Sequence, residues 1–280
     1  MLIFRDYDQK ALDAQYDNRA RVPEFATHVA AWKSGSDAAR AALSAELDLP
    51  YGPDARQRLD IFPPLRQPWP VAVFIHGGYW RAMEKELFAF LAPAFVAAGV
   101  GFVNLEYRLC PAVGIGDIVA DIDAALGWVA TNIARFGGDP NHVHVMGHSA
   151  GGHLAALALS RHAGLRGAVA VSGLYELEPI RLSFLNADLR LDAGQARALS
   201  PLHALPQGPR GPLLLAVGGA ESEEFHRQQR DYAAAWRAGR RPVLEMMPEG
   251  RDHFTVLSAL GDPGQALFDA ALRQILGPAP

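Results

Sequence analysis

Short apolar runs alternate with longer helix-like segments along most of this chain. The runs are rich in β-branched residues and are bounded by Gly, Pro or polar residues; they are 71–76 (VAVFIH), 100–107 (VGFVNLEY), 142–148 (HVHVMGH), 167–173 (GAVAVSG) and 213–219 (LLLAVGG). Such runs predict strands that are buried on both faces of a sheet. Two further strands are predicted at 58–62 and 243–248.

The segments between these strands have the apolar spacing of helices. They are 84–98, 117–137, 150–162, 222–239 and 264–276, and the second of them ends in Gly137-Gly138, a typical helix stop. Strands that alternate with helices predict an α/β fold in which helices cover both faces of a mostly parallel sheet.

Two intervals depart from this alternation. Residues 8–47 have a polar–apolar helical pattern and are followed by a break at 49–54, so residues 1–50 are predicted to form an N-terminal helical extension. Residues 174–212 are long, contain Pro and Leu, and are predicted to form a small cap or lid insertion over the functional site. At 280 residues, we expect one domain spanning 1–280.

Composition and charge narrow the classes of function. With 50% hydrophobic and 20% charged residues, the chain can build a sizeable core, and a net charge of −4 gives no electrostatic reason to bind nucleic acid. No uncharged apolar run is long enough for a bilayer, and the first ten residues lack the pattern of a signal peptide. Cys110 is the only cysteine, which rules out an intrachain disulfide. We therefore expect a cytoplasmic protein that acts on a small molecule, without a membrane partner; the sequence leaves its oligomeric state open.

The central motif is Gly147-His148-Ser149-Ala150-Gly151, a Gly-x-Ser-x-Gly pattern. The pattern alone is weak, but here it follows a predicted strand and opens a predicted helix, which is the context of a nucleophile elbow. Glycines flank the serine because the turn is too tight for side chains at those positions. Ser149 is therefore the predicted nucleophile.

A serine nucleophile needs a base, and in this arrangement the base is a histidine late in the chain. Of ten histidines, His253 lies in a loop after the last predicted strand and before the final helix, and it is the predicted base. The third group is a carboxylate that orients the imidazole. Glu221 follows the strand at 213–219 and is favoured, although Glu223 and Glu224 are close enough to compete.

Hydrogen-bond donors for an oxyanion are expected in two places. One is the backbone N–H of Ala150, the residue after the nucleophile. The others belong to the glycine-rich loop after the strand at 71–76, where Gly78 and Tyr79 are the predicted donors and Gly77 is the alternate. Tyr79 and Trp80 are predicted either to pack in the interior or to line the substrate pocket.

No metal site or cofactor is predicted. His142, His144 and His148 could be mistaken for a metal cluster, but no cysteine or carboxylate of matching spacing supports one. No dinucleotide fingerprint or P-loop is present either.

The order HGGYW (76–80), GHSAGG (147–152), an acid and DHF (252–254) resembles the esterase/lipase branch of the α/β-hydrolase superfamily. Within it, the chain is most similar to the serine-type kynurenine formamidases, also called arylformamidases. The similarity rests on HGGYW and on LDAQYDNRARVP (12–23), SGLYELEPI (172–180), ESEEFHRQQRDY (221–232) and DHF.

The resemblance implies the α/β-hydrolase fold, with nucleophile at Ser149, acid at Glu221 and base at His253. At residue 221 this chain departs from the family, which usually has Asp. The implied activity is hydrolysis of N-formylkynurenine or a similar formanilide. Two alternatives stay open: a carboxylesterase for short acyl or aryl esters, and a non-catalytic binding protein. A carboxylate-binding arginine would favour the formanilide, and the sequence offers Arg81, Arg108 and Arg181 as candidates.

Overall fold

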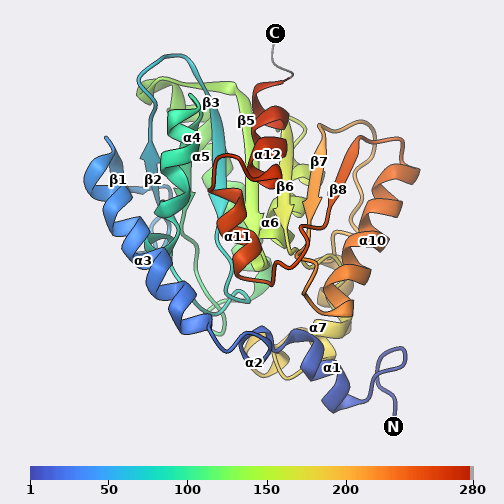
Figure 1. Cartoon of the computed structure of the whole chain (residues 1–280). Coiled ribbons are helices and arrows are strands. Elements are labelled where there is room, and N and C mark those ends of the chain that lie inside the picture. The colour runs from blue at the N-terminus through green and yellow to red at the C-terminus, as the bar shows by residue number, and fades with distance from the viewer. Residues whose placement is uncertain (278–280) are drawn as a thin grey trace.

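A single eight-stranded sheet runs through the computed structural model, which describes residues 1–277. The strand order is β1-β2-β4-β3-β5-β6-β7-β8, and β2 is antiparallel to both of its neighbours, whereas β4 to β8 are parallel (Figure 1). The strands are β1 (Glu46–Pro50), β2 (Arg58–Phe62), β3 (Trp69–Ile75), β4 (Gly101–Leu105), β5 (Gly138–His148), β6 (Gly167–Val171), β7 (Leu213–Ala216) and β8 (Val243–Met246). The predicted α/β-hydrolase fold with its mostly parallel sheet is confirmed.

The central strands are buried on both faces, as their unbroken apolar runs predict. In β3, Val71, Val73 and Ile75 belong to one hydrophobic core, and Ala72 and Phe74 belong to a second core on the opposite face. Successive side chains of a strand point to opposite faces, so one apolar run supplies both cores.

Helices form the two outer layers. In Figure 1, α3, α4, α11 and α12 lie in front of the sheet, and α5 and α6 lie behind it. The helices are α1 (Gln9–Tyr16), α2 (Asn18–Arg21), α3 (Phe25–Ala42), α4 (Ala92–Ala97), α5 (Ile115–Asn132), α6 (Ala150–Arg161), α7 (Glu178–Leu182), α8 (Asn186–Leu189), α9 (Ala193–Ala198), α10 (Glu223–Ala238), α11 (Thr255–Leu260) and α12 (Ala266–Leu276), with 3₁₀ turns η1 (Lys85–Leu87), η2 (Ala89–Leu91) and η3 (Ile133–Phe136).

Some predicted boundaries were wrong. Residues 46–50 form strand β1 rather than the end of a helical extension, because they pair with β2 at the edge of the sheet. The helix predicted at 84–98 is two 3₁₀ turns followed by the short α4, whose Pro93 lies in its first turn; proline has no N–H and is tolerated there but not further along a helix. Helix α11 was not predicted at all.

The N-terminal helices and the 174–212 segment meet beyond the carboxyl ends of the parallel strands. There α1, α2 and α7 lie together at the bottom of Figure 1. The Gln9 side chain donates to the carbonyl oxygen of Leu182 at 3.0 Å, and Asp13 accepts from the N–H of Phe184 at 2.8 Å. In open α/β sheets, ligands bind at this carboxyl edge. No helix within residues 1–277 is long and apolar enough to cross a membrane.

Candidate active site

Ser149 occupies the sharp turn between β5 and α6. Its backbone lies at φ 57° and ψ −119°, a conformation that L-residues rarely adopt. A Cβ atom on Gly147 would lie 2.1 Å from the carbonyl oxygen of Gly151, and one on Gly151 would lie 1.9 Å from that of Ile75. The turn therefore admits only glycine at these two positions, which is the physical basis of the Gly-x-Ser-x-Gly pattern.

A hydrogen-bond chain joins the three residues that the sequence analysis singled out. Nε2 of His253 lies 3.0 Å from Oγ of Ser149, and Nδ1 of His253 lies 2.6 Å from Oε2 of Glu221. All three side chains are buried, with Ser149 only 3% exposed. A hydroxyl, an imidazole and a carboxylate in this order can activate the hydroxyl as a nucleophile.

Glu221 is the carboxylate that contacts His253, and the two competing glutamates face elsewhere. The other carboxylate oxygen of Glu221, Oε1, accepts from Oγ of Ser172 at 2.6 Å and from the N–H of Gly218 at 2.7 Å, and these two bonds fix the side chain. Glu223 is exposed, and Glu224 pairs with Arg227 at 2.8 Å.

The glycine-rich loop lies directly against the serine. A Cβ atom on Gly77 would lie 3.0 Å from Cβ of Ser149, so the loop packs directly against the turn and leaves little room for a side chain at this position. Gly78 and Tyr79 follow at positive φ, and within residues 1–277 no hydrogen-bond acceptor is found for their N–H groups or for that of Ala150. These free donors can serve a negatively charged oxygen at Ser149.

His76 braces this loop. Its Nδ1 lies 2.7 Å from the carbonyl oxygen of Gly77, and its Nε2 lies 3.1 Å from Oε1 of Glu106. Burial alone would raise the pKa of the Glu106 carboxyl, but His76, Arg56 and a backbone N–H together lower it. Glu106 is therefore an ionised anchor for the loop.

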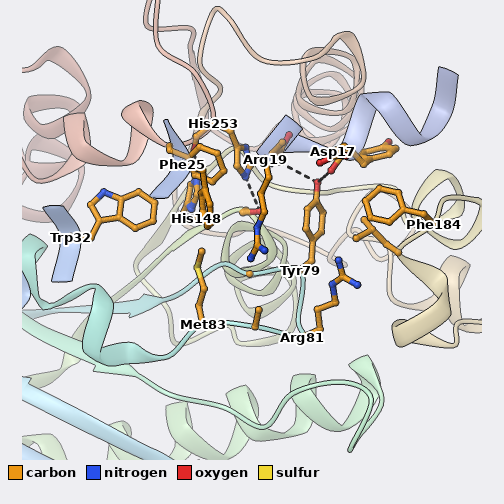
Figure 2. Close-up of a pocket in the computed structure, with 17 residues that line it drawn as sticks. Asp17, Arg19, Phe25, Trp32, Tyr79, Arg81, Met83, His148, Phe184 and His253 are labelled. Atoms are coloured by element: carbon orange, nitrogen blue, oxygen red, sulfur yellow. Dashed lines mark hydrogen bonds between the residues drawn. The ribbon is translucent and has the colours of Figure 1, made fainter. Parts of the chain in front are cut away.

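A pocket opens above Ser149, and aromatic side chains form much of its wall (Figure 2). The rings of Phe25 and Phe254 lie 4.8 Å apart, and Trp32 packs 6.1 Å from Phe254. Apolar walls around a few polar groups are typical of small-molecule sites. The aromatic lining residues are Phe25, Trp32, Tyr79, Phe184 and Phe254, together with Tyr16.

Tyr79 lines the pocket, but the prediction that Trp80 also lines it was wrong. Trp80 is 0% exposed and packs edge-on against His153, with ring centroids 5.0 Å apart. Tyr79 instead donates from its hydroxyl to the carbonyl oxygen of Tyr16 at 2.8 Å, so it joins the loop to the N-terminal segment.

Sequence patterns did not predict the N-terminal contribution to this pocket. Residues 16–19, from the junction of α1 and α2, line it together with Met83 and with Phe184 and Leu185 of the 174–212 segment. The one available signal was the similarity of LDAQYDNRARVP to known formamidases, which did not reveal what the segment contacts.

The three arginines considered as carboxylate receptors have different surroundings. Arg108 is held by Asp121 at 2.6 Å and Arg181 by Glu178 at 2.7 Å, and neither lines the pocket. Arg81 does line it, but its guanidinium is paired with Asp188.

Two other kinds of chemistry, a cysteine nucleophile and a metal site, can be compared with the structure. Burial raises the pKa of the Cys110 thiol to about 11, so this side chain carries little thiolate near neutral pH. Within residues 1–277, no three His, Cys, Asp or Glu side chains are grouped as metal ligands would be.

Known proteins are similar to this chain in both sequence and fold. The BD-FAE family model matches residues 59–169. The chain is 30% identical over 264 residues to the kynurenine formamidase of Salmo salar, which covers 89% of this chain and 88% of that protein. A Silicibacter sp. protein, described provisionally as a thioesterase, superposes with a TM-score of 0.82 at 31% identity. The superposition covers 94% of this chain and 98% of the Silicibacter chain.

A more distant structure supports the fold alone. Esterase B from Lactobacillus rhamnosis superposes with a TM-score of 0.72 at 19% identity, covering 91% of this chain and 96% of that one. Together, the sheet topology and these similarities identify the chain as a hydrolase of the α/β-hydrolase superfamily, in its esterase branch, that belongs to the same family as the kynurenine formamidases.

Proposed function

We propose that this protein is a serine hydrolase that cleaves arylformamides such as N-formylkynurenine through an acyl-enzyme on Ser149. The observation that carries the proposal is the hydrogen-bond chain from Glu221 through His253 to Ser149, at the base of a pocket with aromatic walls. An aromatic pocket suits an aryl leaving group, and the formamidase relatives align with 89% of the chain.

The proposed reaction has two halves. His253 takes the proton of Ser149 as Oγ attacks the formyl carbon, and Glu221 stabilises the imidazolium that forms. The oxyanion accepts hydrogen bonds from the N–H groups of Gly78, Tyr79 and Ala150, with Gly77 as the alternate donor.

His253 then gives its proton to the aniline nitrogen, and the arylamine leaves. In the second half, His253 deprotonates a water molecule that attacks the formyl-enzyme. Formate is released and the Ser149 hydroxyl is regenerated. No step requires a cofactor.

A carboxylesterase for short acyl or aryl esters is the second candidate, and the match of residues 59–169 to the BD-FAE family supports it. It would use the same residues, so the two candidates differ only in the substrate. A third candidate is a hydrolase-fold binding protein without activity, which would leave Ser149 unreactive toward an organophosphate.

Steady-state hydrolysis of N-formylkynurenine, beside p-nitrophenyl acetate, tests the proposal. We expect kcat/KM for the formanilide at or above about 10⁴ M⁻¹s⁻¹, a usual value for a physiological substrate. Ser149→Ala should lower the rate by about 10⁴-fold or more. Rapid ester turnover with negligible formanilide turnover would instead establish the carboxylesterase.

A further inference from the structure

Arg19 brings a positive charge to the pocket. It lines the pocket from α2, and its guanidinium carbon lies 4.6 Å from the centre of the Phe25 ring. Within the described residues 1–277 it forms no salt bridge, whereas Arg81, across the pocket, is paired with Asp188. Figure 2 shows the Arg19 side chain extended over the pocket between Tyr79 and Met83.

Asp17, two residues earlier, brings a negative charge to the same pocket. Its Oδ1 accepts from the N–H of Ala20 at 3.1 Å, which caps α2, and the second oxygen stays available. No lysine, arginine or histidine of residues 1–277 forms a salt bridge with it. Asp17 lies beside the hydroxyl of Tyr79 in Figure 2.

The backbone that carries these two charges is held firmly. The Tyr16 hydroxyl donates to Glu224 at 2.8 Å and accepts from Gln228 at 2.9 Å, inside the protein. On the pocket side, the Tyr79 hydroxyl donates to the carbonyl oxygen of Tyr16 and accepts from the Asn18 amide at 3.2 Å. Asp17 and Arg19 are thus attached to the same loop that approaches Ser149, and a ligand meets them already positioned.

We infer that Asp17 and Arg19 together bind the α-amino acid end of the substrate. Asp17 would accept from the α-ammonium group, and the edge of the Arg19 guanidinium would donate to the α-carboxylate while its face stays against Phe25. The aromatic wall would then hold the aryl ring and leave the acyl group at Ser149.

The inference rests on the proposed acyl transfer at Ser149 and narrows its substrate class. A neutral formanilide would gain nothing from these charges, whereas a zwitterionic one matches both. The predicted substrate is therefore an arylformamide or aryl ester whose leaving group carries a free α-amino acid.

Two substrates separate this recognition from catalysis. N-formylkynurenine has the amino acid end, and 2-formamidoacetophenone has the same formanilide and ketone without it. We expect Arg19→Gln to lower the ratio of kcat/KM for the first substrate to that for the second by about tenfold, mainly through KM, as for the loss of a charged hydrogen bond. Asp17→Asn should lower it in the same direction, because Asn keeps the helix cap and loses the charge.

Arg21→Gln is the matched control, since Arg21 is an exposed arginine of the same short helix that does not line the pocket. It should leave the ratio unchanged. An unchanged ratio in Arg19→Gln, or equal losses for both substrates, would overturn the inference. Formanilide turnover by the unaltered enzyme would still uphold the proposed function in that case.

Inhibition of p-nitrophenyl acetate hydrolysis provides a readout that needs no formamidase activity. L-kynurenine should inhibit competitively, and Arg19→Gln should raise the ratio of its Ki to that of 2-aminoacetophenone by about tenfold. If no formanilide is hydrolysed but this shift occurs, the amino acid receptor stands and the formamidase proposal fails. If L-kynurenine does not inhibit the unaltered enzyme, the receptor does not exist.

Discussion

Nε2 of His148 lies 2.8 Å from the carbonyl oxygen of His253, so the residue before the nucleophile holds the loop that carries the imidazole. The two imidazole rings also pack with centroids 4.8 Å apart. Burial, and secondarily the charge of His253, lowers the pKa of His148 well below its usual range. His148 is therefore neutral, with its proton on Nε2, where it donates to that carbonyl group. The Gly-x-Ser-x-Gly pattern leaves this position unspecified and therefore did not predict the contact.

The hydrogen bond from His148 to the carbonyl oxygen of His253 can be tested by removing the Nε2–H donor and then restoring a donor at the same place. His148→Leu should lower kcat by about five- to tenfold with little change in KM, as the loss of one net hydrogen bond would. His148→Gln keeps an N–H near the position of Nε2 and should recover most of the rate. Equal losses in both variants would point to general disruption of the turn.

Glu221 can be tested against its neighbour Glu223. Glu221→Gln keeps the shape but loses the charge that stabilises the imidazolium, so kcat should fall by about 10³- to 10⁴-fold. Glu221→Asp restores the charge at a shorter reach and should retain far more activity. Glu223→Gln, at an exposed position two residues later where α10 begins, should behave like the unaltered enzyme. Steady-state rates on p-nitrophenyl acetate measure all three, and full activity in Glu221→Gln would contradict the role proposed here.

Gly78 combines a φ of +110° with close packing, because a Cβ atom there would lie 2.1 Å from the carbonyl oxygen of Ala82. Gly78→Ala should displace the N–H groups offered to the oxyanion and lower kcat by about 10²-fold or more. Gly99→Ala is the control: its φ is +82°, but nothing lies within 4 Å of the added atom. It should cost some stability and leave kcat close to that of the parent, as thermal melting and steady-state rates would reveal.

The buried His153 should make the fold sensitive to acid. Its Nε2–H donates to the carbonyl oxygen of Leu199 at 2.8 Å, its Nδ1 has no partner within residues 1–277, and burial lowers its pKa to about 4. As the pH falls, His153 takes up a proton near pH 6.5 in the unfolded chain but only near pH 4 in the folded protein. The stability that the neutral, buried His153 contributes to the fold is therefore complete above pH 6.5 and is lost as the pH falls toward 4.

The expected loss is about 1.4 kcal/mol of unfolding free energy per pH unit between these limits, for this residue alone. Denaturant unfolding at several pH values measures it. His153→Gln can keep a donor to Leu199 but does not titrate, so its stability should fall less steeply with acid. Parallel curves for the two proteins would show that His153 protonates freely in the folded state.

Local sequence alone determined the central parallel strands and the nucleophile turn. Short apolar runs that are rich in β-branched residues and bounded by turn residues favour strands buried on both faces. Gly147 is required by a contact within the turn itself, because a Cβ atom there would lie 2.1 Å from the carbonyl oxygen of Gly151. The prediction of His253 relied on chain order, and the structure brings its imidazole to Ser149.

Where nearby residues of one type compete, the outcome depended on the tertiary structure. Glu221 and Glu224 are three residues apart, yet one contacts His253 and the other contacts Tyr16 and Arg227, because α10 begins between them and turns the second away. Tyr79 and Trp80 are adjacent, and only the first lines the pocket.

The pocket wall is the part of the site that the sequence could not supply. Asp17 and Arg19 lie in the chain some 130 residues before Ser149, and their spacing resembles that of any polar helical stretch. Their position follows from long-range hydrogen bonds, such as Tyr16 with Glu224 and Tyr79 with Tyr16, which only the folded chain forms. Backbone sterics act over a few residues and can be read in sequence, whereas the surface presented to a substrate depends on which distant segments pack together.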